Sequence, residues 1–426
     1  MRIWLINHYA VPIQYYPLAR TTNFAKYLMR MGHEVTIFAA SAVHNSTVNL
    51  IEDGSLFREE YVDGIHYVYV RCRSYTGNGI GRISNMFEFA WRLESVCEQF
   101  PKPDAVLASS ATPMACKEGL KLAKKYGVRA VAEVTDLWPE SFVAYGLLSK
   151  YNPILIPMYH YEKKMYEYAD EIVFSMEGAY DYIEDRGWQG SIPRAKIHYI
   201  NNGVDLETFD YNKEHYTVDD EDLRGSDTFK VIYVGSIRLV NNIGKLIDVA
   251  KRIKNPRIKF LLWGKGDELK MLQQLVIDEK IENVAFKGYV DKKYVPYIAS
   301  QADLNIVSFL PASVDEKYGI SPNKMFDYMA AGKPILTVFP SKYNPAVQIG
   351  AGEGVQSPSV ENIAAAVVRF ADMDGETYAK YCQNARKGAQ QYDFKRLTED
   401  LLAIMMQNRN MARKNIRRDN TWNLST

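Results

Sequence analysis

The stretch of sequence that decides the fold is YGISPNKMFDYMAAGKPILTV, residues 318–338. Ser321 and Pro322 are typical of a helix start, where a hydroxyl caps the first turn and proline fits the first helical position. Gly332 is typical of a helix end, because glycine adopts the left-handed conformation without steric penalty. These signals predict a helix over Pro322–Ala331 that leads into a strand.

The start of this helix has the features of an anion site. A helix N-terminus presents free N–H groups and about half a positive charge, which together favour phosphate. Lys324 adds a full charge in the first turn, and Asp327 lies on the same face as Asn323 and Lys324. The sequence predicts that backbone amides and Lys324 bind a diphosphate while Asp327 accepts hydrogen bonds from hydroxyl groups. An ordinary capped core helix is the alternative interpretation.

Outward from this helix, the chain alternates short apolar runs with helical stretches. A strand over Arg2–Asn7, a helix and a strand over Glu34–Ala40 open the pattern, and it restarts with a strand over Lys230–Val234. Further strands are expected over residues 65–70, 105–108, 128–133, 171–175, 196–200, 259–263, 284–288, 304–308 and 335–338. Such alternation favours an α/β fold with doubly wound parallel sheets.

The length of the chain fits a division into domains, because 426 residues correspond to roughly two to three domains of ordinary size. We predict a first domain over residues 1–205 and a second over 206–390. The segment 391–426 is expected to form a helix that returns to the first domain, followed by a basic tail. The polar, acidic stretch Asn201–Asp222 is interpreted as the linker.

Composition and charge exclude several classes of protein. Lys and Arg number 52 against 51 Asp and Glu, so the formal net charge of +1 gives no field for a nucleic-acid partner. The four cysteines lack the spacing of a zinc site or disulfide framework and suit a reducing compartment. The first apolar run is too short for a signal peptide, and no stretch reaches the length of a membrane span. We therefore expect a cytoplasmic protein.

The helix motif resembles a known family when it is taken together with NNGVD at 201–205 and GKGDE at 264–268. The chain is similar to retaining GT-B glycosyltransferases of the family 4 type, and its SPNK and YMAAGKP segments resemble the bacterial O-antigen and capsule aminosugar transferases. The resemblance covers essentially the whole chain. It implies a GT-B fold, in which two Rossmann-like doubly wound domains face a cleft.

The resemblance also implies an activity. Such enzymes move a sugar from a nucleotide-diphosphate donor to a glycan or lipid-linked saccharide with retention of configuration, during surface polysaccharide synthesis. The implied donor is UDP-linked and carries an N-acetylated aminosugar. Two rival functions remain: a sugar-nucleotide epimerase of the same fold, and a non-catalytic sugar-nucleotide-binding protein. A nicotinamide dehydrogenase is disfavoured, because the first loop lacks GxGxxG.

In its second half, the chain departs from the family pattern at two places. The family has two acidic residues eight positions apart around the helix start; the second is Asp327 here, but the first falls on Gly319. The family also has Arg and Lys after the first strand of the second half, where this chain has Ser236 and Asn241. Arg238 is the nearby replacement that we favour, since a guanidinium can bond two diphosphate oxygens.

The donor site is expected at the ends of strands in the second half. Gly264 follows one such strand, and FKGYV at 286–290 resembles the segment whose backbone contacts the base. The predicted donor-binding residues are Gly235, Arg238, Gly264, Tyr289, Val290, Ser321, Pro322, Asn323, Lys324 and Asp327. Arg238 and Lys324 are also predicted to be catalytic, because they would stabilise the leaving diphosphate.

The acceptor site is expected in the first half. Arg20 enters a helix beside the crevice at the strand ends, where open α/β sheets bind ligands, and His8 follows the first strand. The segment AEVTDLWPESF at 132–142 resembles the E-x-x-DLWPES signature of the aminosugar transferases. Asp136 is predicted as an acceptor-hydroxyl partner or catalytic carboxylate. Trp138 either stacks on a sugar or packs in the core.

Metal and membrane contact complete the sequence predictions. The Asp-x-Asp spacing occurs at Asp220–Asp222 and Asp372–Asp374, in an acidic stretch and a turn, and no His or Cys cluster accompanies it. We predict transfer without a metal or other cofactor. Residues 77–96 form either a core helix or an interfacial helix, and the basic tail over 409–418 is either solvated or drawn to anionic lipid at the inner face of the cytoplasmic membrane.

Overall fold

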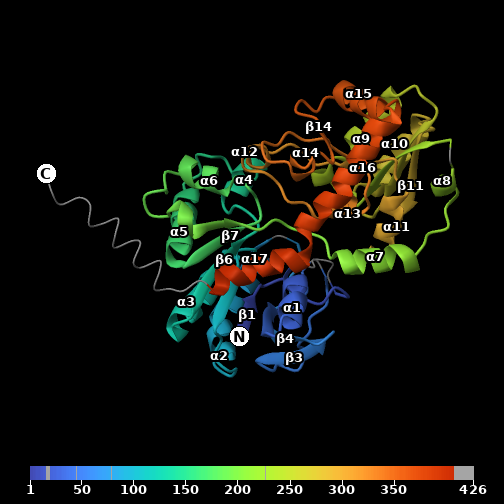
Figure 1. Ribbon diagram of the computed structural model, residues 1–426. Helices are drawn as coiled ribbons and strands as arrows, with labels where there is room; N and C mark the ends of the chain where they lie inside the picture. Colours follow the sequence, from blue (N-terminus) through green and yellow to red (C-terminus); the bar gives the residue numbers. More distant parts are fainter. Residues whose placement is uncertain (16–19, 45, 78, 226, 407–426) are drawn as a thin grey trace.

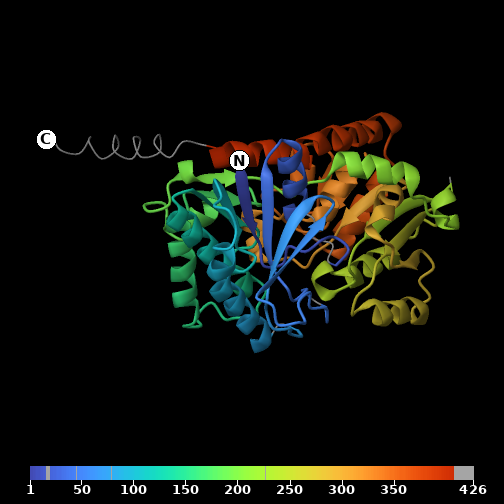
Figure 2. The same cartoon turned by 90° about the horizontal axis from the view of Figure 1, so that it is seen from below.

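The computed structural model describes residues 1–15, 20–44, 46–77, 79–225 and 227–406 (Figure 1). Within these residues, the first sheet has eight strands in the order β3-β4-β2-β1-β5-β6-β7-β8, and the second has six in the order β11-β10-β9-β12-β13-β14. Each sheet carries helices, and the two α/β units lie next to each other (Figures 1 and 2). The predicted α/β fold with two doubly wound sheets is confirmed.

The first unit holds the larger sheet. Its strands are β1 (Arg2–Ile6), β2 (Glu34–Ala40), β3 (Phe57–Val62), β4 (Ile65–Val70), β5 (Ala105–Ser109), β6 (Arg129–Val134), β7 (Glu171–Phe174) and β8 (Ile197–Tyr199). Its helices are α1 (Arg20–Arg30), α2 (Ile80–Cys97), α3 (Pro113–Tyr126), α4 (Glu140–Ala144), α5 (Leu155–Tyr168) and α6 (Ala179–Asp185), with a 3₁₀ turn at Arg194–Lys196.

The second unit holds the smaller sheet. Its strands are β9 (Phe229–Val234), β10 (Ile258–Trp263), β11 (Val284–Gly288), β12 (Leu304–Val307), β13 (Ile335–Thr337) and β14 (Gly352–Gly354). The helices from here to the end of the described chain are α7 (Leu206–His215), α8 (Glu221–Arg224), α9 (Ile243–Arg252), α10 (Leu269–Asp278), α11 (Val295–Ser300), α12 (Ser313–Tyr318), α13 (Asn323–Ala330), α14 (Pro345–Gln348), α15 (Val360–Ala371), α16 (Gly375–Ala389) and α17 (Phe394–Met406). Further 3₁₀ turns lie at Leu239–Asn241, Lys292–Tyr294 and Gln390–Tyr392.

Neighbouring strands are parallel throughout the described sheets except for one pair. β3 runs antiparallel to β4 at the edge of the first sheet, and the sequence analysis assigned no strand there. Its sequence FREEYV carries charged residues that remain in water, as suits an edge strand. The inner strands, such as β5 and β6, are buried along their whole length because helices cover both faces.

The stretch predicted as a linker over Asn201–Asp222 contains two helices, α7 and α8. Aspartates that looked like turn signals act as helix caps: Asp205 accepts from the backbone N–H of Thr208 at 3.1 Å, and Asp220 accepts from that of Asp222 at 2.9 Å. An aspartate satisfies free N–H groups at a helix start as readily as it favours a turn. The crossing between the sheets is therefore the short segment between β8 and α7.

The two units also contact each other away from this crossing segment. α12 of the second unit packs against α4 and α6 of the first. The backbone N–H of Gly178 donates to the carbonyl oxygen of Tyr318 at 2.9 Å. A Cβ on Gly178 would lie 2.5 Å from the Cα of Tyr318, so only glycine permits this approach. The space between the units is thus bounded at both sides.

The last helices run along both units, as Figure 2 shows most clearly. α16 packs against α13 of the second unit, whereas α17 packs against α1 of the first. Phe394 at the start of α17 contacts Phe24 edge to face, with ring centroids 5.6 Å apart. Leu401 on the same face is fully buried in the first core.

Removal of the Leu401 side chain tests how far α17 stabilises the first unit. We expect Leu401→Ala to lower the free energy of unfolding by about 2–5 kcal/mol, because it leaves a cavity in a closed core. Urea unfolding measures the change. Met406→Ala is the control, since this residue of the same helix is 59% exposed and its truncation should shift the midpoint little. Equal shifts in both variants would contradict a packed α17.

Candidate active site

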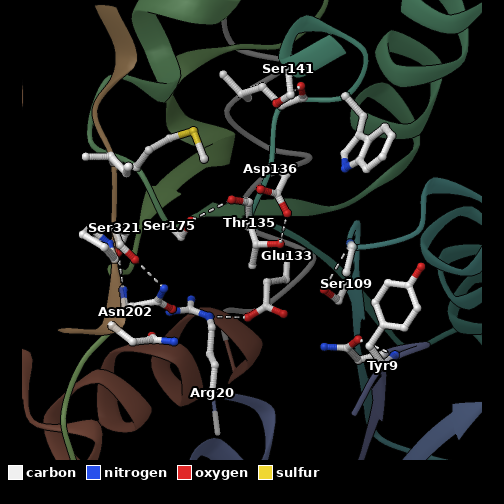
Figure 3. A pocket seen from close by; sticks show the side chains of 18 of the residues that line it. Tyr9, Arg20, Ser109, Glu133, Thr135, Asp136, Ser141, Ser175, Asn202 and Ser321 are labelled. Carbon is white, nitrogen blue, oxygen red and sulfur yellow. Dashed lines mark hydrogen bonds and ion pairs between the residues drawn. The ribbon is translucent and has the colours of Figure 1, made fainter. Parts of the chain in front are cut away.

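A cleft of 510 Å³ lies between the two units (Figure 3). One wall comes from the first unit, chiefly from the carboxyl ends of β1, β5, β6 and β7 and the residues after them, and the other includes the segment from α12 to the start of α13. The lining includes Asn7, Tyr9, Arg20, His44, Arg82, Ser109, Glu133, Thr135, Asp136, Trp138, Tyr145, Ser175, Asn202, Asp315, Gly319, Ser321, Pro322 and Asn323. Loops at the carboxyl ends of parallel strands converge on such crevices, so this cleft is the candidate active site.

Arg20 links the elements at the base of the cleft through its hydrogen bonds. Its Nε donates to Oε1 of Glu133 at 2.8 Å, and the two side chains are only 10% and 3% exposed. Its terminal nitrogens donate to the carbonyl oxygens of Asn201 at 2.6 Å and Ile200 at 2.9 Å. Figure 3 shows the guanidinium between Glu133 and Asn202. Most of its N–H groups are thus engaged within the protein, and its predicted contact with the acceptor stays a prediction.

The start of α13 differs from the prediction in one respect. Ser321 does not cap the helix; Pro322 occupies the cap position, and the helix spans Asn323–Ala330. The hydroxyl of Ser321 instead accepts from the backbone N–H of Asn202 at 2.8 Å, and its carbonyl accepts from the Asn202 side chain at 2.6 Å. This contact with the crossing segment takes the hydroxyl away from the helix. Gly332 has the left-handed conformation that was predicted, with φ +66°.

Lys324 lies in the first turn of α13, against the loop after β9. Its Nζ donates to the hydroxyl of Tyr233 at 3.0 Å and to Oδ1 of Asn241 at 2.9 Å. Burial lowers the pKa of Lys324 to about 7, because these neutral partners do not balance its charge. Asn241 occupies the position at which the sequence motif of the family would have a lysine. Here the ammonium beside that position comes from Lys324 of α13 instead.

One of the predicted glycines lies against this lysine, and a second packs on the first. A Cβ on Gly235 would lie 3.2 Å from Nζ of Lys324, and a Cβ on Gly264 would lie 1.8 Å from the carbonyl oxygen of Gly235. Gly264 has φ +153°. The two loops therefore touch backbone to backbone, and Gly264 is needed for that packing whatever the site binds. The structure brings Gly235, Gly264 and Lys324 together at the carboxyl ends of β9 and β10.

The other donor-side predictions lie farther out. Arg238 is exposed in the loop after β9. Burial lowers the pKa of His44 on the first unit to about 4, and the charges of Arg82 and then Arg238 add to that effect. Tyr289 is 57% exposed, with Nζ of Lys265 3.9 Å from its ring centroid, and Val290 packs at the edge of a core cluster. None of these three lines the 510 Å³ cleft, and their contact with a donor stays a prediction.

Asp327 and Asn323 line a second cavity of 700 Å³, which lies beside the crossing segment. Asn323 lines both cavities, so the first turn of α13 separates them. Burial raises the pKa of the Asp327 carboxyl, and the charge of Lys292 opposes that effect. Asp327 is thus a largely enclosed carboxylate one turn beyond Lys324, and its ribose contact stays a prediction.

Two of the predicted acceptor-side residues lie in the cleft with free polar atoms. Asp136 follows β6, and its side chain accepts one hydrogen bond from the described residues, a long one of 3.4 Å from the Thr135 hydroxyl. Enclosure by the cleft walls raises its pKa. Trp138 packs edge to face on Phe142, and its buried Nε1 has no hydrogen-bond partner among the described residues.

His8 was predicted to contact the acceptor, but the structure places it in the core. It is 1% exposed, and its Nε2 lies 2.6 Å from Oδ1 of Asn85 on α2. Burial lowers its pKa to about 3, so the ring is neutral at ordinary pH. The neighbouring Asn7 and Tyr9 line the cleft instead. Successive residues after β1 alternate between cleft and core, so the prediction that His8 contacts the acceptor is wrong.

The sequence analysis missed Asp315 and Tyr145. Asp315 lies on α12, and its Oδ2 accepts from the hydroxyl of Tyr145, on the opposite wall, at 3.1 Å. Burial raises the pKa of Asp315 to about 6, and the charge of Asp136 raises it further. In the sequence, Asp315 looks like an ordinary acidic residue in the first turn of a helix. Its position just before the motif at 318–338 was the only local signal.

Comparison with known families matches both halves of the chain. Residues 19–208 match the family described as Glycosyltransferase Family 4, and residues 218–388 match that described as Glycosyl transferases group 1. The fold and the cleft together define a glycosyltransferase of GT-B architecture. Within that class, the chain belongs to the family 4 type, as the sequence motifs predicted.

Individual relatives agree with this assignment. TuaH of Bacillus subtilis (strain 168), named as a teichuronic acid biosynthesis glycosyltransferase, is 26% identical over 213 residues, which span 49% of this chain and half of that curated relative. The sucrose-phosphate synthase of Thermosynechococcus elongatus has a TM-score of 0.69 at 17% identity, covering 95% of this chain and 98% of its own. HepE of Anabaena, solved with UDP, has a TM-score of 0.64 at 15% identity, covering 95% and 99%. The structural similarities show the fold.

The raised pKa of Asp315 predicts a dependence of stability on pH. Because its carboxyl titrates at about 6 in the folded protein against an ordinary 3.8, its stabilising effect is present below pH 4 and is lost as the pH rises through 6. Asp315→Asn cannot ionise and still accepts from Tyr145. We expect this variant to exceed the wild type in unfolding free energy by on the order of 1 kcal/mol at pH 7.5, after allowance for solvent screening, with little difference at pH 4.

Urea unfolding at the two pH values measures this difference. Glu316→Gln removes the exposed carboxylate of the next residue and should leave stability unchanged at both. A Glu316→Gln variant that behaved like Asp315→Asn would contradict the assignment to an enclosed carboxylate.

Proposed function

We propose that this protein is a glycosyltransferase that moves a sugar from a nucleotide-diphosphate donor to a saccharide acceptor in surface polysaccharide synthesis. The observation that carries the proposal is the position of Lys324, whose ammonium lies at the start of α13 against the glycine-containing loop after β9, on which the glycine loop after β10 packs. A buried ammonium with neutral partners gains most when a ligand brings negative charge. A diphosphate supplies that charge where the N–H groups of α13 begin.

The leaving diphosphate is the group that these residues stabilise. Negative charge builds on it as the bond to the sugar breaks, and preorganised donors lower the energy of that state. Lys324 and the first turn of α13 are in place, and Arg238 reaches the diphosphate from the loop after β9. In this proposal these groups act without a metal ion. Asp220 and Asp222, the acidic pair considered for a metal, form ion pairs with Lys287 instead.

Transfer proceeds with retention of configuration in this proposal. A phosphate oxygen of the donor removes the proton from the acceptor hydroxyl on the same face of the sugar, so the protein need not supply a base. Asp136 accepts from that hydroxyl and orients it. Its position on the cleft wall opposite α12, with most of its hydrogen-bonding capacity unused, supports this role.

The donor that we propose is a UDP-linked N-acetylated aminosugar. HepE, which shares the fold, has been solved with UDP and with UDP-glucose. The SPNK and YMAAGKP segments add the resemblance to aminosugar transferases. In this assignment, Asp327 binds the ribose, and Tyr289 and Val290 lie at the base.

The acceptor that we propose is a saccharide on a lipid carrier, reached through α2. This helix has a buried face with Phe89 and Leu93 and an exposed apolar stripe. The stripe consists of Ile80, Ile83, Phe87 and Trp91, which are 82%, 48%, 56% and 78% exposed. Among the described helices, none is long and apolar enough to cross a bilayer. Arg82 on the same helix lines the cleft, so a membrane against the stripe would lie at the cleft mouth. The basic tail over 409–418 falls outside the described residues.

Substitution of Lys324 tests the assignment of the diphosphate site. We expect Lys324→Met to weaken UDP binding and to reduce turnover of a UDP-sugar by at least ~10²-fold, as should Arg238→Ala for turnover. Titration calorimetry and a transfer assay across a panel of nucleotide sugars measure both. Lys245→Met is the control, because Nζ of Lys245 donates to the carbonyl oxygen of Pro358, away from the cleft. Wild-type turnover in Lys324→Met would sink the assignment, and turnover of donor alone would favour the epimerase.

Vesicle binding tests the stripe on α2. We expect the double variant Phe87→Ser with Trp91→Ser to lose at least ~5-fold in sedimentation with phosphatidylglycerol vesicles, because it removes apolar area that a bilayer buries. Tyr61→Ser, which changes a 69% exposed residue on β3, is the control. Unchanged sedimentation of the double variant would remove α2 as the membrane contact.

A further inference from the structure

The walls of the cleft carry two carboxylates that face each other from different units. Asp136 follows β6 of the first unit, and Asp315 lies on α12 of the second. Among the ion pairs of the described residues, neither takes part in one; Asp136 is exposed to the cleft, and Asp315 is half-buried in its wall. Each has one hydrogen bond, from Thr135 and from Tyr145. Desolvation by the cleft walls raises the pKa of both carboxyls, and the charge of Arg82 in the same cleft opposes this at Asp136. Both carboxylates keep hydrogen-bonding capacity that a ligand in the cleft can complete.

We propose that Asp315 binds hydroxyl groups of the sugar being transferred, while Asp136 faces it from the acceptor side. The inference rests on the proposed function and names a specificity-determining residue for it. The observation that carries it is the juxtaposition of the two carboxylates in one cleft with Lys324 at the other end of the α12–α13 segment.

The α12–α13 segment carries opposite charges at its two ends, Asp315 on α12 and Lys324 in the first turn of α13. Around Lys324 the first turn of α13 is positive and suits phosphate, whereas two carboxylates repel phosphate at the Asp136 and Asp315 end. Carboxylate oxygens accept hydrogen bonds well from hydroxyl groups, which a sugar offers on several carbons. A nucleotide sugar carries both parts in this order, so its neutral, hydroxyl-rich part lies at the acidic end.

Position 319, the glycine at the other end of α12, cannot carry an acidic side chain that would replace Asp315. Gly319 has φ +89°, and a Cβ there would lie 2.9 Å from the Cβ of Tyr343. A side chain at this position would be both strained and in collision with a neighbour. The carboxylate on this wall therefore comes from the preceding helix, α12.

Tyr145 is a positioning residue for Asp315. Its hydroxyl, on the opposite unit, donates to Oδ2 of Asp315 and leaves Oδ1 for a ligand. This hydrogen bond lowers the pKa of Asp315, whereas burial and Asp136 raise it. The titratable groups on the elements packed around α12 include Glu140 of α4, with Arg186 beside it, Tyr180, Asp181, Tyr182, Glu184 and Asp185 of α6, and Lys317 and Lys342. The contact exists only when the two units are together, so sugar binding is linked to closure of the cleft.

Titration of UDP and of UDP-N-acetylglucosamine and UDP-glucose against four variants tests the proposal. We expect Asp315→Asn to weaken at least one UDP-sugar by ≥ ~10-fold while UDP binds within about twofold of the wild type. Asp136→Asn should leave donor affinity nearly unchanged and reduce transfer to acceptor. Glu316→Gln, on the exposed face of the same helix, should match the wild type throughout.

Tyr145→Phe separates positioning from packing. UDP-sugar affinity of the wild type should rise as the pH passes about 6, when Asp315 ionises, and in Tyr145→Phe this rise should move to higher pH. An unmoved profile would overturn the positioning role.

The remaining outcomes distinguish the two proposals. Retained UDP-sugar affinity in Asp315→Asn, or an equal loss of UDP and UDP-sugar, would overturn the role of Asp315 and leave the proposed function standing. A wild type that binds no nucleotide at all would overturn both.

Discussion

The cleft depends on one buried interaction, the hydrogen-bonded ion pair between Arg20 and Glu133. Arg20 begins α1, Glu133 lies in β6, and the same guanidinium donates to the carbonyl oxygens of Ile200 and Asn201, where the chain leaves the first unit. Breaking one partner of such a pair costs about 3–5 kcal/mol, because a charge is left buried alone. Helix, sheet and crossing segment are thus fixed to one another. Asn202 follows directly and holds Ser321, so the start of α13 is placed relative to the first unit through the same chain of contacts.

The α12–α13 segment carries the two charged groups that can bind a ligand in the cleft. Lys324 lies at one end with neutral partners, and Asp315 lies at the other with a tyrosine from the opposite wall. Both charges are enclosed, and electrostatic interactions are stronger there than in water. The same enclosure moves their pKa values toward neutrality, Lys324 to about 7 and Asp315 to about 6. Keeping these two groups charged costs free energy in the unliganded protein. A ligand of complementary charge and hydrogen bonding removes part of that cost, so its binding stabilises the fold.

Local patterns predicted much of the fold. The strands β2, β4 and β11 have the predicted bounds, a helix lies within the segment from residue 391 as expected, and the helix at 318–338 ends at a left-handed Gly332. Apolar periodicity and glycine conformation act over a few residues, so the sequence reports them directly. Predictions failed where a distant partner competed. Ser321 is drawn from its cap position by Asn202, 119 residues away, and the aspartates of the predicted linker cap α7 and α8.

The sequence by itself determined most of the alternation of strands and helices, the two sheets, the family and the lysine at the helix start, but not β3, α7 or α8. Only the tertiary structure decided which polar groups meet. Tyr145 and Asp315 are 170 residues apart in the chain, and Lys324 and Asn241 are 83 apart. It also placed His8 in the core and Asn7 in the cleft. Helices and strands form through contacts between near neighbours, whereas the cleft forms where two separately folded sheets pack, and no local pattern specifies which side chains that packing brings together.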